Sequence, residues 1–215
     1  MATGIQLNNI RSKYGFHPRT ILDIGAQIGD FAQECKTFWP NAKISMIEAT
    51  RDCEPYLQGL SQHEDYEYKI AVLSNISGKE IDFYKTKHAK TNTGNSVYRE
   101  NTEYYNDVNV IVEKRITETL DEIYKDNQFD MIKIDTQGSE IDIMKGGTNL
   151  MSKAVLVILE VSYINYNEGA PLADSVDKFM VDNGFVKDIK VGESTNNIHG
   201  VFQEDYVYVN KEFVK

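Results

Sequence analysis

An acid and two glycines mark the end of an apolar segment near the start of the chain and the turn that follows it. The stretch ILDIGAQIGDF places Asp23, Gly25 and Gly29 in the pattern Asp-x-Gly-x-x-x-Gly. A dinucleotide-binding turn has Gly-x-Gly-x-x-Gly, in which the second glycine lets the backbone touch a pyrophosphate. Aligned on Gly25, the second and third glycines are replaced by Gln27 and Asp30. This spacing keeps the tight turn but lacks the glycine that lets the backbone contact a pyrophosphate. It therefore disfavours a nicotinamide-dependent oxidoreductase.

A second acid follows where the next strand should end. Glu48 stands near the end of KISMIEA at 43–49, and a carboxylate there can accept the hydroxyl protons of a ribose. Acids around a ligand favour a cation, and S-adenosylmethionine carries an ammonium, a sulfonium and an adenosine but no phosphate. These residues therefore predict a site for S-adenosylmethionine at the carboxyl ends of two strands. The structural alternative is that Gly25 and Gly29 only let a helix pack closely, with Glu48 a solvated strand end.

The segments around these residues alternate between strand-like and helix-like patterns. Amphipathic segments such as DFAQECKTFW and ADSVDKFMVDNGF are interspersed with strand-like runs at 20–26, 43–49, 66–73, 129–136 and 154–162. This alternation predicts a parallel sheet with right-handed crossovers. FVKDIKV and DYVYVN near the end also alternate like strands, and the residues between them have no helical period. A parallel pair would need a crossover, so an antiparallel pair is predicted.

One long segment interrupts the alternation. An insertion at about 79–117 holds the strand-like EIDFYK and VNVIVEKRI on either side of a polar loop at 86–107. Loops of this length are usually functional or disordered. We expect the loop to form part of an acceptor site. The alternative is that it pairs with another subunit in a homodimer and buries Tyr98, Tyr104 and Tyr105.

Several motifs, taken in order, resemble one enzyme family. ILDIGAQIGDFA, ISMIEAT, AVLSNISG, MIKIDTQGSEIDIMKGG, ILEVSY and EDYVYVN are similar to those of the FkbM-type S-adenosylmethionine-dependent methyltransferases, over about residues 15 to 210. The resemblance implies an α/β class I methyltransferase (Rossmann-like) fold. This is a three-layer sandwich around a seven-stranded, mostly parallel sheet with an antiparallel C-terminal hairpin. It also implies O-methylation of sugars, surface glycans or natural products. A common variant of the family's fourth-strand motif has Glu where this chain has Gln137.

The resemblance also implies a set of site residues. The residues expected to bind S-adenosylmethionine are Asp23, Gly25, Ala26, Gln27, Ile28, Gly29, Phe31, Glu48, Ala49, Ala71, Val72, Asp135 and Thr136. Asp135 ends the fourth strand, next to the first in this fold, so it is also expected to be a catalytic carboxylate. The alternative is that Asp135 only caps a turn ahead of Gly138.

Methyl transfer to a hydroxyl needs alignment of the acceptor and removal of its proton. His88 in the polar loop and His199 in the final hairpin loop are candidates for the catalytic base, because a neutral imidazole accepts a proton near pH 7. The alternative for each is an ordinary exposed histidine. Asp135, Glu140 and Glu160 could converge, but no His or Cys ligand spacing is present and no metal site is predicted. Glu140 could equally open the following helix.

Composition limits the partners. The net charge of −10 argues against nucleic acid, which needs a basic face. No apolar run approaches the ~20 residues of a membrane span, and MATGIQLNNIRSKYGF lacks a signal-peptide core, so we expect the cytoplasm. Cys35 and Cys53 are expected to be free thiols. The sequence thus predicts one domain, 1–215, that methylates a hydroxyl of a saccharide or related small molecule. A different class remains open, a catalytically silent S-adenosylmethionine-binding partner protein.

Overall fold

The computed structural model describes residues 2–3, 5–87 and 93–213 of the chain. Within these residues the main sheet has eight strands, in the order β1-β10-β11-β9-β8-β2-β3-β4. The strands are β1 (Ala2–Thr3), β2 (Thr20–Ile24), β3 (Lys43–Glu48), β4 (Tyr66–Ile70), β8 (Met131–Ile134), β9 (Leu156–Ser162), β10 (Phe185–Asn196) and β11 (Gly200–Asn210). Apart from the two-residue β1, these are the seven strands of the predicted fold.

The direction of the strands also agrees with the prediction. β4, β3, β2, β8 and β9 pair in parallel. β11 pairs antiparallel with both β9 and β10. The predicted fold class, a mostly parallel sheet ending in an antiparallel hairpin, is therefore confirmed. The hairpin strands are longer than the sequence pattern indicated, since only residues 197–199 form the turn between them.

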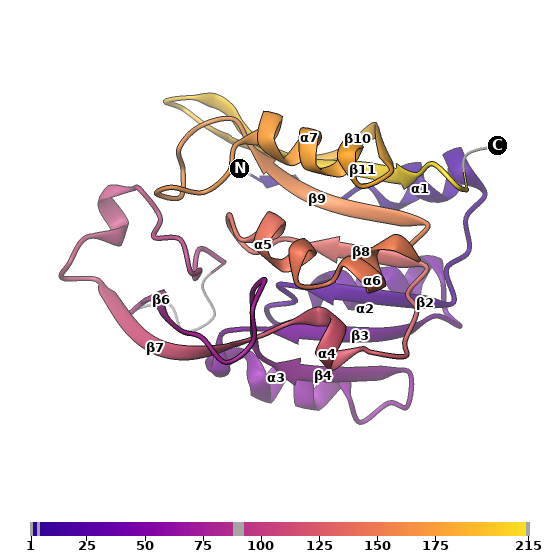
Figure 1. Cartoon of the computed structure of the whole chain (residues 1–215), viewed down its shortest axis with the longest axis horizontal. Helices are drawn as coiled ribbons and strands as arrows, with labels where there is room; N and C mark the ends of the chain where they lie inside the picture. Colours follow the sequence, from indigo (N-terminus) through magenta and orange to yellow (C-terminus); the bar gives the residue numbers. More distant parts are fainter. Residues whose placement is uncertain (1, 4, 88–92, 214–215) are drawn as a thin grey trace.

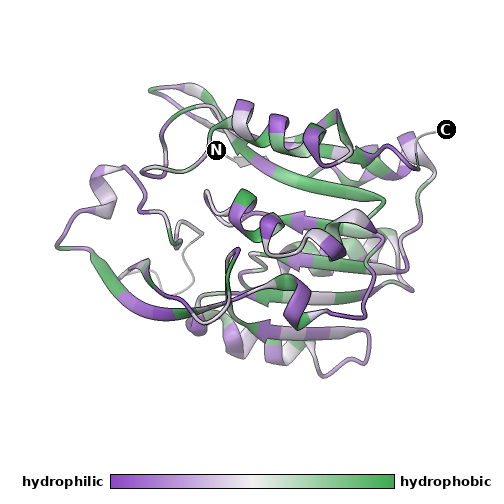
Figure 2. Ribbon diagram, in the orientation of Figure 1, coloured by the Kyte–Doolittle hydropathy of each residue, from purple (hydrophilic) through white to green (hydrophobic). Residues whose placement is uncertain are grey.

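Helices cover both faces of the main sheet (Figure 1). One face carries α1 (Leu7–Tyr14), α2 (Asp30–Phe38) and α3 (Glu54–Leu60), after the short 3₁₀ helix at Arg51–Cys53. The other carries α4 (Leu120–Ile123), α5 (Glu140–Lys145), α6 (Thr148–Ser152) and α7 (Ala173–Asp182). Figure 2 shows the apolar residues concentrated along the central strands, as expected for a sheet buried on both sides.

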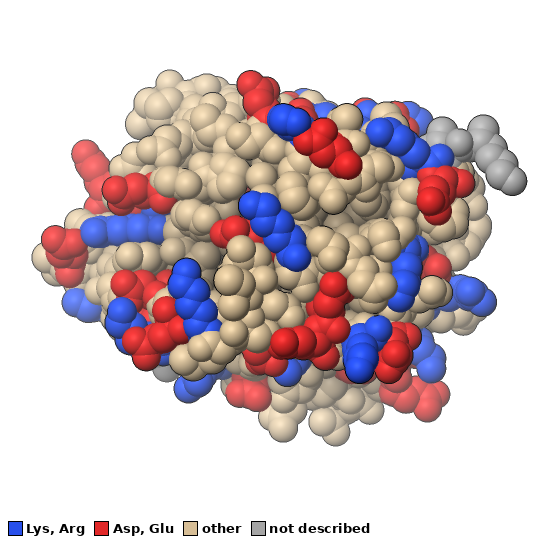
Figure 3. Space-filling view, in the orientation of Figure 1, with Lys and Arg blue, Asp and Glu red and all other residues tan. Residues whose placement is uncertain are grey.

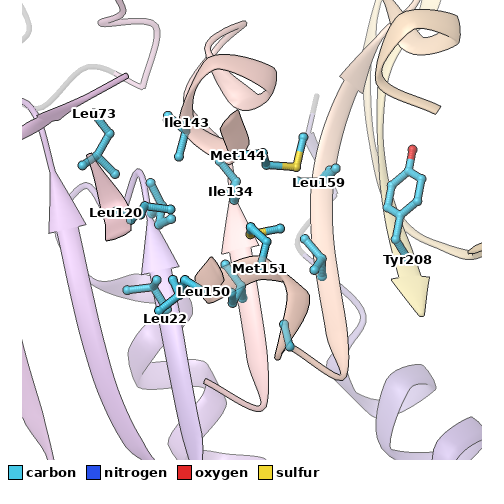
Figure 4. Close-up of a cluster of buried hydrophobic side chains, with 14 of the residues drawn as sticks. Leu22, Leu73, Leu120, Ile134, Ile143, Met144, Leu150, Met151, Leu159 and Tyr208 are labelled. Atoms are coloured by element: carbon cyan, nitrogen blue, oxygen red, sulfur yellow. The ribbon is translucent and has the colours of Figure 1, made fainter. Parts of the chain in front are cut away.

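The alternation of side chains along β2 sorts its residues between these two layers. Leu22 and Ile24 belong to the core beneath α4–α7, and Ile21 to the core beneath α1–α3. Asp23 shares the face of Ile21, because residues two apart in a strand point the same way. In Figure 4 the first of these cores joins the sheet to α4, α5 and α6 through Leu22, Leu120, Ile134, Ile143, Met144, Leu150, Met151 and Leu159. Each such side chain contributes roughly 1.5–3 kcal/mol when fully buried, which fixes the register of β2.

The two strands of the long insertion form a small sheet with the short strand that follows β4. β5 (Val72–Leu73), β7 (Val110–Glu118) and β6 (Glu80–Thr86) lie in that order, with β6 and β7 antiparallel from Glu80↔Ile116 to Thr86↔Val110. A 3₁₀ helix at Glu103–Tyr105 lies within the loop between β6 and β7. Figure 1 shows this sheet beside the carboxyl ends of the central strands. The insertion therefore lies where ligands bind in open α/β sheets.

Candidate active site

A cleft of about 550 Å³ lies at the carboxyl ends of the central strands, between the main sheet and the insertion. Most of the residues predicted to bind the cofactor line it: Asp23, Gly25, Ala26, Gln27, Phe31, Glu48, Ala49, Ala71, Val72, Asp135 and Thr136. Ile28 and Gly29 do not line it. The cleft also takes in residues that the sequence did not single out for the cofactor, among them Lys133, Glu160, Tyr166, Phe202 and Gln203.

The glycine turn after β2 needs both of its glycines. Gly25 has φ +82°, and a β-carbon there would lie 1.8 Å from the main-chain oxygen of Asp135. Gly29 has φ +88° at the start of α2, and a β-carbon there would lie 2.4 Å from Leu60. Positive φ and close packing both exclude side chains. The close approach at Gly25 is thus made by the backbone that follows β8, which draws Asp135 to the turn.

Glu48 is not a solvated strand end. Its side chain is largely buried, and its two oxygens accept hydrogen bonds from the backbone N–H groups of Gln27 (2.8 Å) and Thr50 (2.6 Å). Each carboxylate oxygen can accept more than one hydrogen bond. The carboxylate is therefore held rigidly at the cleft and still has acceptor capacity for the two hydroxyls of a ribose.

Asp23 is a fully buried carboxylate that lines the cleft. Neither of its oxygens has a hydrogen-bond partner among the described residues. The nearest cation, the Lys133 ammonium, is 3.9 Å away. Burial raises the pKa of Asp23 to about 6, a shift that Lys133 opposes and that Asp135 and Glu48 reinforce. A buried carboxylate without a hydrogen-bond donor is destabilising, so a cationic group bound in the cleft would stabilise it.

Lys133 joins the first and fourth strands of the site. It is the register partner of Asp23, and its Nζ donates to Asp135 Oδ2 at 3.1 Å. The same ammonium lies 5.4 Å from the centre of the Phe31 ring. The neighbouring acids Asp135, Asp23 and Asp205 outweigh burial and raise the pKa of Lys133, so it stays charged. The sequence carried one signal for it, a lone lysine within the apolar run MIKI.

A chain of polar side chains links the ends of β8, β9 and β11. Gln137 Nε2 donates to Asp135 Oδ1 (3.2 Å) and to Glu160 Oε2 (2.6 Å). Gln203 Nε2 donates to the same Glu160 oxygen at 2.9 Å. Gln137 adopts φ +57°, which is unusual for a residue with a side chain. Here an amide bridges two carboxylates.

Glu140 organises the turn between β8 and α5. It is buried, and its Oε1 accepts hydrogen bonds from the N–H groups of Thr136 and Gly138, each at 3.1 Å. Burial raises the pKa of Glu140. It does not line the main cleft. Within the described residues no group of three or more His, Cys, Asp and Glu side chains could hold a metal ion.

The insertion closes the outer end of the cleft. Asn95, Ser96, Glu100 and Tyr104 line it, and the Ser96 hydroxyl lies 3.0 Å from the main-chain oxygens of Thr136 and Gln137. Side chains from the insertion also contact the segment after β3. Arg115 donates to the Ala49 carbonyl (2.6 Å), and Lys85 forms an ion pair with Asp52 (2.6 Å). Asn95 Nδ2 lies 3.3 Å from Thr50 Oγ1.

The two candidate histidines have different outcomes. His88 lies outside the described residues. His199 is exposed in the turn between β10 and β11 and does not line the cleft.

Of the three tyrosines considered for a subunit interface, Tyr105 is buried within the chain and Tyr98 donates to Asp142 (2.9 Å). Tyr104 is 46 % exposed.

Comparison with known proteins assigns the family. The model of the "Methyltransferase FkbM domain" family matches residues 23–187, which include the glycine turn, the insertion, Gln137 and Glu160 but not Gln203. The chain belongs to the FkbM methyltransferase family. A relative named "Putative methyltransferase" from Jannaschia sp. (strain CCS1) is 32% identical over 82 residues, which are 38% of this chain and 28% of that protein. The matched segment therefore spans less than a third of that relative.

Solved structures share the fold of this FkbM-family chain at low sequence identity. A precorrin-6y C5,15-methyltransferase from Geobacter metallireducens GS-15 superposes with a TM-score of 0.52 at 10% identity, over 94% of this chain and 86% of that one. A magnesium protoporphyrin IX methyltransferase from Synechocystis PCC 6803, crystallised with S-adenosylmethionine, gives 0.52 at 11% identity, over 94% and 74%. These similarities establish the class I methyltransferase fold. No helix in the described part of the chain has the length and apolar character to cross a membrane.

Proposed function

We propose that this protein is an S-adenosylmethionine-dependent O-methyltransferase that acts on a hydroxyl of a saccharide, a surface glycan or a natural product. One observation carries the cofactor assignment. The cleft of an FkbM-family chain holds the buried carboxylate of Asp23, without hydrogen-bond partners among the described residues, and the backbone-anchored carboxylate of Glu48. A ligand with a cation near the first and a diol near the second satisfies both groups.

Different residues of the cleft would contact different parts of the cofactor. Glu48 would accept the ribose hydroxyls, and Asp23 would face the ammonium of the methionine part. The apolar side chains of Ala49 just after β3, Ala71 just after β4 and Val72 in β5 would flank the adenine. Bound S-adenosylmethionine supplies an electrophilic methyl group attached to a good leaving group. The protein's part is then to orient the acceptor hydroxyl, exclude water and take up a proton.

The outer end of the cleft supports a polyhydroxylated acceptor. Tyr166 and Phe202 form an aromatic pair with ring centres 5.0 Å apart, and both line the cleft. The amides of Asn95, Gln137 and Gln203 lie along the same cleft. Aromatic faces pack on the apolar faces of sugar rings while amides hydrogen-bond to hydroxyls. Figure 3 shows positive and negative side chains intermixed on the face drawn, an arrangement more suited to a neutral acceptor than to a polyanion.

A transfer assay tests this function. The purified chain would be incubated with S-adenosylmethionine labelled in the methyl group and a panel of methyl glycosides, with NAD⁺ and an oxidisable alcohol as a parallel reaction. We expect labelled methyl ethers from at least one glycoside and no NADH. Binding of S-adenosylhomocysteine without transfer to any glycoside would favour the silent partner protein, or an acceptor of another class.

Two further expectations concern location and assembly. We infer a cytoplasmic protein, a placement that the free, buried thiols of Cys35 and Cys53 support. We also infer a homodimer, for which the exposed apolar side chains of Val112 and Ile116 on β7 offer a surface. Light scattering of the purified chain distinguishes a monomer from a dimer, and Ile116→Lys should shift a dimer to monomer.

A further inference from the structure

The adjacent ends of β8 and β9 place two carboxylates in the cleft in unlike surroundings. Asp135 accepts a hydrogen bond from the ammonium of Lys133 at 3.1 Å, so its charge has a cationic partner. Glu160 accepts hydrogen bonds only from amides, those of Gln137 and Gln203, within the described residues. The two acids are therefore not equivalent, and Glu160 is the one without a compensating cation in contact.

The hydrogen bonds to Glu160 are also one-sided. Both amide nitrogens donate to Oε2, at 2.6 and 2.9 Å. In the described part of the chain no donor reaches Oε1, although Glu160 lines the cleft. The two amides come from separate elements, Gln137 after β8 and Gln203 in β11, so this oxygen is held from two sides. One oxygen is anchored and the other is available to a ligand.

The charges around Glu160 disfavour its ionised form. Around it lie Lys133 on β8, Asp135 just after β8, Asp205 on β11, Glu140 at the start of α5 and the Tyr166 hydroxyl after β9. Burial is the largest cause, and the three acids add to it, so the pKa of Glu160 lies well above that of an ordinary glutamate while Lys133 offsets the shift in part. A carboxylate with this raised proton affinity is a stronger base than a solvated one.

Resting on the function proposed above, we propose that Glu160 is the general base of methyl transfer, with Gln137 and Gln203 as the residues that position it. As the acceptor oxygen bonds to the methyl carbon, the carbon–sulfur bond breaks with its electron pair left on sulfur. The hydroxyl proton passes to Oε1 of Glu160, and the neutral acid then returns it to solvent through the cleft. Substrates and products balance as one ether, one thioether and one released proton.

A titration tests this base without any acceptor. The side-chain carboxyls would be labelled with ¹³C-glutamate and titrated by NMR in the S-adenosylhomocysteine complex of the native chain, Glu160→Gln and Glu168→Gln, an exposed control. We expect the resonance lost only in Glu160→Gln to titrate well above the ordinary value of about 4.3. An ordinary midpoint for that resonance would overturn the proposal.

The pH profile of transfer separates a base from a structural acid. With a methyl glycoside that the native chain methylates, Glu160→Gln should lower kcat by about 10²–10⁴-fold and remove the acidic limb of the profile. Glu160→Asp should restore part of both, and affinity for S-adenosylhomocysteine should be unchanged in all variants. An unchanged profile in Glu160→Gln would contradict the proposal. If the native chain binds S-adenosylhomocysteine and methylates no glycoside, the saccharide assignment fails, while an ordinary midpoint in the titration would still overturn the assignment of Glu160 and a raised one would still support it.

Discussion

Lys133 on β8 and Asp23 on β2 are register partners in the central sheet, and the lysine ammonium lies 3.9 Å from one oxygen of that buried carboxylate. The same ammonium is 3.1 Å from Asp135. One buried cation thus serves two acids from adjacent strands. Because neither Asp23 oxygen has a hydrogen bond within the described residues, the pair leaves negative charge unsatisfied at the cleft.

This arrangement predicts a pH-dependent stability. The pKa of Asp23 is raised from 3.8 to about 6 in the folded chain, so folding favours its protonated form. Its contribution is fully present below about pH 4 and is lost as the pH rises through about 6, an effect of roughly 3 kcal/mol. In urea unfolding at a series of pH values, Asp23→Asn should make the decline smaller by about this amount, because Asp205, whose pKa is raised to about 7, contributes in the same direction. The exposed control Asp126→Asn should keep the full decline. The same decline in both variants would contradict the assignment to Asp23.

A substitution at Lys133 should be costly for a related reason. Lys133→Met substitutes an uncharged side chain of similar length and leaves Asp23 buried without its cation. Breaking a buried pair by removing one partner costs roughly 3–5 kcal/mol, so the midpoint of urea unfolding at pH 7 should fall sharply. The loss should be smaller in Lys133→Met combined with Asp23→Asn. Equal losses in the single and double variants would show that the pair is not coupled.

The glycine turn allows a matched comparison. Gly25 and Gly78 both have positive φ, but only at Gly25 would a β-carbon meet the backbone, at 1.8 Å from the Asp135 oxygen. Gly78→Ala should cost only the conformational strain, about 1–3 kcal/mol. Gly25→Ala should cost more and also weaken S-adenosylhomocysteine binding, because Asp135 must move. Similar unfolding free energies for the two variants would mean that the contact with β8 is looser than described.

Glu48 should affect both binding and folding. Glu48→Ala removes the acceptor for two backbone N–H groups, those of Gln27 and Thr50, and each buried unsatisfied donor costs roughly 1–3 kcal/mol. Binding of S-adenosylhomocysteine should also weaken by about 1–3 kcal/mol. Glu48→Gln keeps one oxygen acceptor, so its stability and its affinity for S-adenosylhomocysteine should be intermediate between those of the native chain and Glu48→Ala. Unchanged affinity in a folded Glu48→Ala would remove Glu48 from the ribose site.

The outer end of the cleft should matter for the acceptor and not for the cofactor. Phe202→Ala removes one ring of the pair with Tyr166, and an aromatic contact contributes about 0.5–1.5 kcal/mol beyond its buried area. KM for a methyl glycoside should therefore rise several-fold while affinity for S-adenosylhomocysteine holds. The exposed Phe213→Ala serves as the control. A fall in cofactor affinity alone would place Phe202 at the wrong end of the cleft.

The strands of the sheet could be predicted from the sequence, and most of the residues expected to bind the cofactor do line the cleft. Both follow from local patterns. The Asp-x-Gly turn and Glu48 sit at strand ends whose direction the alternation of elements determines. Lys133 was missed because a lysine in an apolar strand is explained only by the acid facing it on the neighbouring strand. The positive φ of Gln137 has no local signal, since it is not a glycine.

The long-range parts of the site were beyond local reasoning for the same physical cause. Glu160 is oriented by Gln203, 43 residues further along the chain, and that contact depends on how β11 inserts beside β9. His199 was expected over the cleft, but the hairpin strands continue through most of the segment that had no helical period, and the turn carries His199 into solvent. The insertion could be located by its length, whereas its grip on the loop after β3 depends on contacts such as Arg115 with Ala49.

Titration calorimetry with S-adenosylhomocysteine tests the central claim most directly. We expect the native chain to bind one equivalent of S-adenosylhomocysteine. We expect no binding heat from NAD⁺, because Gln27 and Asp30 occupy the positions of the pyrophosphate-binding glycines. Absence of S-adenosylhomocysteine binding by a folded chain, or displacement of S-adenosylhomocysteine by NAD⁺, would contradict it.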